Sequence, residues 1–113
     1  MPDVSRKPVK NNHFHILLAL SNSSMHGFAI QRDVKEQTGG HLHLWPATLY
    51  GSLDELCERA LIEELKDPAD RPAESEKRRY YRITQAGRQA VTAEAERMMA
   101  LVRIAQERTR KEA

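Results

Sequence analysis

Two short segments carry the side chains best suited to chemistry on another molecule. In the first, Thr48 and Tyr50 offer hydroxyl groups to a phosphate or a base edge, and Gly51 allows close approach. In the second, at positions 77–79, three consecutive cations could reach phosphates or a narrow minor groove. The combination favours contact with DNA. The candidate contacts are Ala47, Thr48, Tyr50, Gly51, Asp54, Lys77, Arg78 and Arg79.

Both segments also have structural interpretations. The ring of Tyr50 could pack against a neighbouring helix, as half-buried tyrosines often do. Asp54, Glu55 and Glu58 repel phosphates, so they would mark the part of the helix that leaves the DNA groove. Acidic residues at positions 67, 70, 74 and 76 partly cancel the second cationic segment, which could then simply shield a core.

Metal and catalytic chemistry are not favoured. His13 and His15, like His41 and His43, are two residues apart, but each pair supplies only two ligands without a supporting carboxylate or thiolate cluster. Cys57 is the only cysteine, which excludes an intramolecular disulfide, fits a reducing cytoplasm and favours a packing role. No phosphate-binding glycine loop, nucleophile elbow or paired acid and base is present. We therefore expect that the protein is not an enzyme and that it holds no metal ion and no cofactor.

The first segment belongs to a predicted helix over residues 45–61. Pro46 suits the first turn of a helix because its φ angle is already helical. The apolar residues of one stripe face a core and leave the other faces for a partner; they are Leu49, Leu53, Leu56 and Ala60. Short strands are predicted at residues 61–65 and 78–84, joined by a charged loop with two prolines that forms the tip of a hairpin.

Two further helices are predicted before this unit. The first contains the dense apolar run that begins at Phe14 and ends at the turn SerAsnSerSer. The second begins at Gly27 and ends at Gly39 and Gly40. Residues 41–45 read as an extended connection, where a short strand is expected. A helical unit followed by a small hairpin predicts a mainly α fold with a small β-wing, the winged helix-turn-helix.

The last predicted element is a long helix, capped by Thr84, that runs to near the end of the chain. Its apolar residues repeat at steps of four and three, which is the seam of a coiled coil. We expect this helix to pair two copies of the chain, although it could fold back on its own core. The predicted dimer residues are Val91, Ala95, Met98, Val102 and Ala105.

Four blocks of the sequence resemble the PadR family of transcriptional regulators. They are MetHisGlyPhe at 25–28, ProAlaThrLeuTyrGlySerLeu at 46–53, LeuIleGluGlu at 61–64 and ArgArgTyrTyrArgIleThrGlnAlaGly at 78–87. Their order matches the family, and together they are more specific than one short motif. Ala47 stands where the family often has glycine or serine, which affects only local base contacts. The resemblance implies a homodimer that binds operator DNA through winged helices and is released by a small effector.

Composition is compatible with this reading. The 113 residues make one domain, with 18 Lys and Arg against 16 Asp and Glu, so overall charge alone does not indicate nucleic-acid binding. We divide the chain into a flexible basic arm (1–12), a winged helix-turn-helix (13–84) and a dimerisation helix (85–113). No apolar run approaches transmembrane length and no signal-type segment follows the basic N-terminus, so we expect a cytoplasmic protein without a membrane partner.

The expected function is that of a homodimeric repressor on a pseudo-palindromic operator of double-stranded DNA, released by a hydrophobic or aromatic small molecule. Candidate residues for the effector pocket, which could equally be core, are Phe14, Trp45, Met98 and Met99. One alternative is a winged helix that docks on another protein. Another is a repressor that responds to metal or redox state through the histidines or Cys57.

Overall fold

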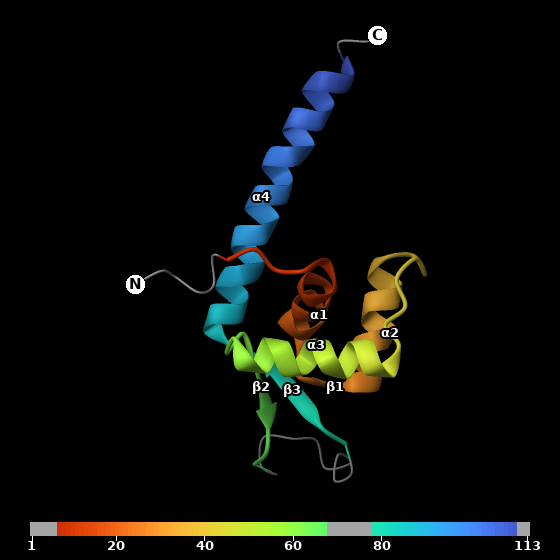
Figure 1. Ribbon diagram of the computed structural model, residues 1–113, viewed down its shortest axis with the longest axis vertical. Helices are drawn as coiled ribbons and strands as arrows, with labels where there is room; N and C mark the ends of the chain where they lie inside the picture. The colour runs from red at the N-terminus through yellow and green to blue at the C-terminus, as the bar shows by residue number, and fades with distance from the viewer. Residues whose placement is uncertain (1–6, 68–77, 111–113) are drawn as a thin grey trace.

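The computed structural model describes residues 7–67 and 78–110 of the chain. Within them four helices accompany a small sheet (Figure 1), which confirms the predicted mainly α fold with a small β component. The expected tip of the hairpin, with Lys77, lies outside the described residues. The elements are α1 (Asn11–Asn22), β1 (Met25–His26), α2 (Gly27–Gln37), α3 (Pro46–Glu58), β2 (Ile62–Leu65), β3 (Tyr80–Ile83) and α4 (Gln85–Arg110).

The sheet has three antiparallel strands in the order β1-β3-β2. The prediction of a strand in residues 41–45 is wrong: these residues form no strand, and the third strand of the sheet is the two-residue β1. Met25 of β1 lies opposite Tyr81, and Ile62 of β2 lies opposite Ile83. Leu44 is instead buried in the core, which fixes the connection by side-chain packing rather than by a strand ladder.

The core fills the space between the three short helices and the sheet. Tyr81 is fully buried there, whereas Tyr80 stays partly exposed, which settles which of the two tyrosines points inward. Burial raises the pKa of the Tyr81 phenol to about 12. The other main contributors are Ile16, Leu17, Leu20, Ile30, Val34, Leu49, Leu53, Leu56 and Leu61.

Helix α3 begins at Pro46, as predicted, but it ends before the predicted residue 61. Its last helical residue is Glu58, and Ala60 has a φ of +58° and an exposed side chain. Ala60 therefore does not belong to the apolar stripe that Leu49, Leu53 and Leu56 form. Its left-handed conformation ends the helix, and the N–H of Leu61 donates to the carbonyl of Leu56 as the chain turns into β2.

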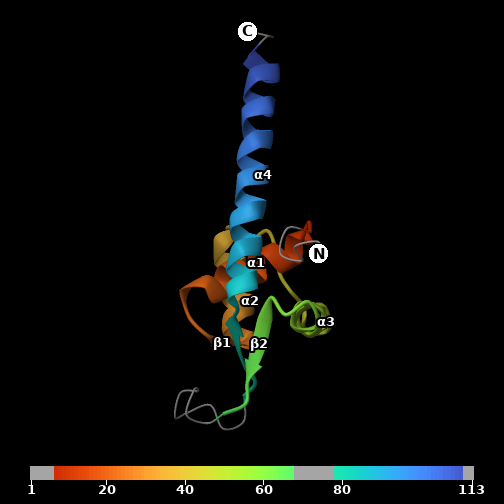
Figure 2. The same cartoon turned by 90° about the vertical axis from the view of Figure 1, so that its left-hand side faces the viewer.

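Helix α4 starts on the sheet and then leaves the domain (Figures 1 and 2). The N–H of Gly87 donates to the Thr84 hydroxyl over 3.1 Å, which confirms the predicted cap. Gly87 and Ala90 are buried against the domain, but every residue from 99 to 110 is exposed. More than a third of this helix thus has no packing partner among the described residues of one chain.

Candidate nucleic-acid interface

The candidate contacts on α3 all lie on its exposed side. Ser52 and the three leucines of the stripe face the core. The opposite face carries the predicted residues Ala47, Thr48, Tyr50, Gly51 and Asp54. A Cβ added at Gly51 would meet no atom within 4 Å, so the middle of this strip is flat. A convex helix with small central side chains and hydroxyl groups beside them can approach the base edges of a major groove.

One side of the strip meets the start of α2. His26 caps that helix, since its Nδ1 accepts the N–H of Ala29 over 3.2 Å. Tyr50 is 39% exposed, and a Cβ added at Gly27 would lie 2.6 Å from its hydroxyl oxygen, so its ring covers that glycine. Tyr50 thus packs on α2 and also presents polar surface. A hollow there is lined by His26, Gly27, Phe28, Tyr50, Arg78 and Arg79.

Arg78 borders this hollow with its guanidinium against a neutral ring. Its Nη1 lies 2.9 Å from Nε2 of His26, while burial, followed by the charges of Arg78 and Arg32, lowers the His26 pKa. A neutral imidazole has one acceptor nitrogen, so the cap to Ala29 and an Arg78 bond compete for it. A phosphate oxygen would be a stronger acceptor for Arg78 than this ring.

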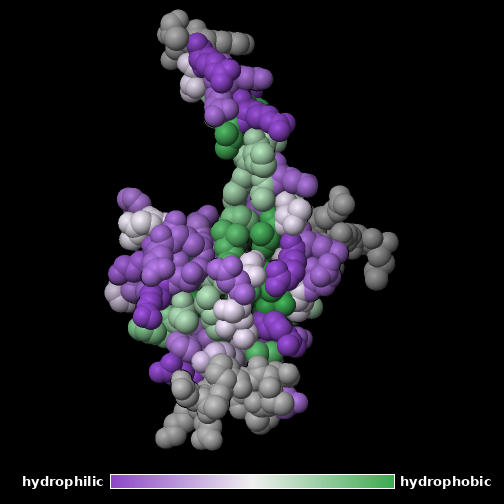
Figure 3. All heavy atoms as spheres, turned by 180° about the vertical axis from the view of Figure 1, so that it is seen from behind, coloured by the Kyte–Doolittle hydropathy of each residue, from purple (hydrophilic) through white to green (hydrophobic). Residues whose placement is uncertain are grey.

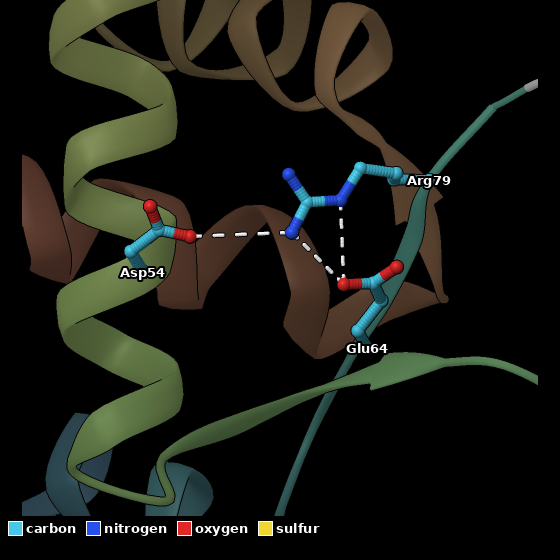
Figure 4. A network of polar contacts seen from close by, with 3 residues as sticks. All are labelled: Asp54, Glu64 and Arg79. Carbon is cyan, nitrogen blue, oxygen red and sulfur yellow. Dashed lines mark hydrogen bonds and ion pairs between the residues drawn. The ribbon is translucent and has the colours of Figure 1, made fainter.

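Arg79 has different surroundings from Arg78. Its Nη2 lies 2.9 Å from the Glu64 carboxylate of β2 and 4.0 Å from the Asp54 carboxylate of α3 (Figure 4). The hydrogen bond to Glu64 raises the Arg79 pKa, and the guanidinium also lies 5.5 Å from the Tyr81 ring centroid. Two predicted DNA contacts, Asp54 and Arg79, are therefore already joined to each other and tie α3 to the sheet.

The other side of the strip meets the start of α1, which begins at Asn11. Lys10 Nζ and His13 Nε2 lie 3.2 and 3.0 Å from the same oxygen of Glu55. His13 is only 3% exposed, and burial lowers its pKa although Glu55 acts in the opposite direction. At neutral pH the ring is therefore uncharged, and Lys10 supplies the positive charge. The hydrogen bond from Lys10 lowers the Glu55 pKa.

Stability should decrease in mild acid because of this buried histidine. His13 has a folded pKa below 6.5, so the unfolded chain takes up a proton first as pH falls, and stability is lost progressively from pH 6.5 downward. We expect a lower thermal midpoint at about pH 5.5 than at about pH 7.5. His26, whose pKa is also lowered, contributes in the same direction.

Substitution separates the contribution of His13. The His13→Gln variant keeps a donor for Glu55 and should show a smaller loss of midpoint over that pH range. His41→Gln, at an exposed ring, is the control and should keep the full loss. Differential scanning calorimetry measures the thermal midpoints of the wild type and both variants. If the midpoint depends on pH equally in all three proteins, His13 does not have this role.

The histidine pairs do not converge on a metal site. His13 and His15 lie on a helix rather than a strand, so their rings diverge: His13 faces α3, and His15 Nδ1 lies 2.7 Å from Gln37 of α2. Nδ1 of His43 lies 2.9 Å from Nε2 of Gln31, and its ring contacts the Trp45 ring at a tilted angle of 57°. Among residues 7–67 and 78–110, no three ligating side chains gather in a way that could hold a metal ion.

Cys57 is half-buried beside the core, which matches the expected packing role, and burial raises the pKa of its thiol. A raised thiol pKa reduces the thiolate fraction, so Cys57 is a poor nucleophile at neutral pH.

The four candidate effector residues are dispersed within one chain. Phe14 is buried in α1, and Met98 and Met99 lie on α4, half-buried and 60% exposed respectively. Trp45 precedes α3 at the end beside α2, whereas the other end of α3 lies toward α4 (Figure 1). There Trp45, 67% exposed, lines an open apolar hollow with Phe28, Leu49 and Tyr50.

The predicted dimer residues follow α4 from the domain outward. Val91, Ala95 and Met98 are half-buried, and Val102 and Ala105 are exposed. Leu101 and Ile104 widen the exposed apolar surface, at 60% and 42% exposure. Figure 3 shows apolar atoms along this helix beyond the body of the domain. The apolar seam thus continues past the point where the chain's own core ends.

Sequence reasoning missed two features of this surface. Phe28, which was not among the candidate contacts, is 66% exposed and lines the hollow beside Tyr50. Lys10 and His13 were not connected with Glu55, because nothing in their sequence separation indicates the contact.

A helix laid across two others with a small antiparallel sheet and hairpin defines a winged helix-turn-helix protein. Residues 16–93 match the model of the transcriptional regulator PadR-like family, and the chain belongs to that family. It is therefore a PadR-family transcriptional regulator, a family that implies DNA binding. None of the helices in the described ranges is long and apolar enough to cross a membrane.

Solved structures share the fold. A PadR family transcription regulator from a hypervirulent Clostridium difficile has a TM-score of 0.72 at 18% identity, covering 87% of this chain and 97% of its own. A transcriptional regulator from Clostridium thermocellum has a TM-score of 0.69 at 21% identity, covering 84% and 89%. RosR from H. salinarum has a TM-score of 0.66 at 23% identity, covering 83% and 77%.

One curated relative is also similar in sequence. It is an uncharacterized 37.1 kDa protein in transposon TN4556 of Streptomyces fradiae, 35% identical over 86 residues. The match covers 76% of this chain and 22% of that protein. The chain thus spans about a fifth of the length of this relative.

Proposed function

We propose that this regulator is a homodimeric repressor that binds a pseudo-palindromic operator through α3 and the β2–β3 hairpin. The observation that carries the proposal is the exposed strip of α3, whose small and hydroxyl side chains lie between cations on both sides. In a dimer paired through α4, two such strips would meet successive major-groove segments of one duplex. A regulator of this kind would work in the cytoplasm.

Release by an effector would act through the same geometry. A hydrophobic or aromatic molecule bound near α4 would change the spacing or angle of the two α3 helices and so lower operator affinity. Met98 and Met99 of α4 and Phe14 of α1 are the side chains to test there, and Trp45, at the other end of α3, is tested separately. Selection of bound fragments from the host genome would identify the operator, and neighbouring genes would indicate the ligand. Failure to enrich any fragment would overturn the proposal.

Arg78 provides a direct test of the DNA contact. Because its guanidinium contacts an uncharged ring, we expect Arg78→Ala to weaken binding to every duplex and to lower the slope of log K against log salt by about 0.9 per contact, or about two for a dimer. Fluorescence anisotropy over a range of salt concentrations measures both quantities.

Arg82→Ala is the matched control, since Arg82 lies four residues after Arg78, on β3, and pairs with Glu63 of β2. We expect it to change the salt slope little. If Arg78→Ala and Arg82→Ala reduce the affinity and the salt slope equally, Arg78 is not the specific phosphate contact. A wild-type protein without affinity for any duplex at any salt would instead indicate a protein-docking module.

A further inference from the structure

A second hollow lies beside α3, on the side away from Arg78. It is bounded by Lys10 and Asn12 at the start of α1, and by Thr48, Gly51 and Glu55 of α3. Successive residues of a helix turn by about 100°, so Tyr50 and Glu55 fall near opposite edges of the exposed strip. Figure 2 places the start of α1 on the same side of the molecule as α3. The strip therefore has a flank on each side, and each flank carries a cation.

The cation of this second flank is held by a weak, exposed contact. Lys10 and Glu55 have side chains that are 72% and 50% exposed. Exposed ion pairs of this kind contribute little to stability, because water and salt screen them. The ammonium of Lys10 could therefore leave Glu55 for a phosphate at small cost. Glu55 would keep the hydrogen bond from the buried ring of His13.

We propose that Lys10 binds a backbone phosphate on the DNA strand opposite to the one that Arg78 contacts. This inference rests on the proposed DNA binding by α3. The major groove is bounded by two phosphate backbones, so a helix inserted into it has one backbone on each side. Arg78 lies on the α2 side of α3 and Lys10 on the α1 side. Without DNA, Glu55 holds the ammonium beside the place that a phosphate would take.

A simpler role for Lys10 must be separated from this one. Glu55 is an acidic residue on the side of α3 that would face DNA, and Lys10 could help binding merely by neutralising it. Glu55→Gln removes that charge but keeps an oxygen that accepts from His13. We therefore compare the wild type with Lys10→Ala, Glu55→Gln and the double variant on a short duplex of random sequence, because phosphate contacts do not depend on base sequence.

Lys10→Ala should weaken binding several-fold and reduce the salt slope by about 0.9 per lost contact. Glu55→Gln alone should tighten binding, because the competing carboxylate is gone. Lys10→Ala should still lower affinity and slope in the Glu55→Gln background. Lys35→Ala, in the last turn of α2, is the charge-matched control and should leave the slope unchanged.

Two outcomes would overturn the inference. If the effect of Lys10→Ala disappears once Glu55 is glutamine, Lys10 only neutralises that carboxylate. If the Lys10→Ala variant binds DNA as tightly as the wild type does, Lys10 makes no phosphate contact. Both outcomes differ from a wild type that binds no duplex, which would contradict the proposed function itself. Thermal melts of all variants check that each remains folded.

Discussion

The Val102→Glu variant is expected to be monomeric and to bind its operator at least about 100-fold more weakly than the wild type. Val102 lies on the predicted seam of α4 and is 52% exposed in the single chain. A carboxylate there would have to be buried without a partner if two α4 helices paired. A monomer contacts one half-site only and loses the gain from linked binding, which amounts to about 10²–10⁴. Sedimentation and operator titration measure the two effects.

Ala100→Glu is the matched control for this experiment. Ala100 is also exposed, lies two residues before Val102, and falls on the opposite face of α4 because two residues turn a helix by about 200°. The variant adds the same charge at the same distance from the domain, so it should stay dimeric and keep its affinity. A Val102→Glu protein that sediments as a dimer, or a wild type that is already monomeric, would contradict pairing through this seam.

Elements with local signals could be predicted from the sequence. Pro46 and the leucine stripe located α3, and the Thr84 hydroxyl located the start of α4, because caps and apolar periodicity act within a few residues. Strand β1 could not be predicted, since it is two residues long and exists only through its pairing with Tyr80 and Tyr81. The left-handed turn at Ala60 could not be predicted either, because alanine rarely adopts that conformation.

The candidate site also has a part that local sequence signals predict and a part that only the packed fold shows. Exposure of the α3 strip followed from the position of its leucines, which the sequence contains. The ion-pair partners of the cations could not be predicted from the sequence, because Arg79 meets Asp54 and Glu64 only when α3, β2 and β3 pack together. The sequence grouped Arg78 with Arg79 as one cationic run. In the fold, Arg78 contacts the neutral ring of His26, whereas Arg79 contacts two carboxylates. Only these surroundings distinguish the two arginines.

The largest expected effect on stability comes from Gly87→Ala. Gly87 is buried in the first turn of α4, close to Leu61, which precedes β2, and to Ile83, which ends β3. A Cβ there would lie 2.1 Å from the carbonyl oxygen of Leu61 and 2.7 Å from Cγ1 of Ile83. The oxygen belongs to the backbone, so α4 itself would have to move. We expect a loss of about 2 kcal/mol, or about 10 °C in thermal midpoint, despite alanine's better helix propensity.

Gly51→Ala distinguishes steric conflict from a general effect of replacing a helical glycine. Gly51 also lies within a helix, but an added Cβ would meet nothing within 4 Å, so the variant should gain about 0.5–1 kcal/mol from helix propensity. Calorimetry should thus show opposite shifts for the same chemical change. If α3 enters a DNA groove, Gly51→Ala should also bind its operator more weakly while being more stable, since the methyl group occupies the flat centre of the strip. Equal destabilisation of both variants would mean that α4 does not depend on the close approach at Gly87.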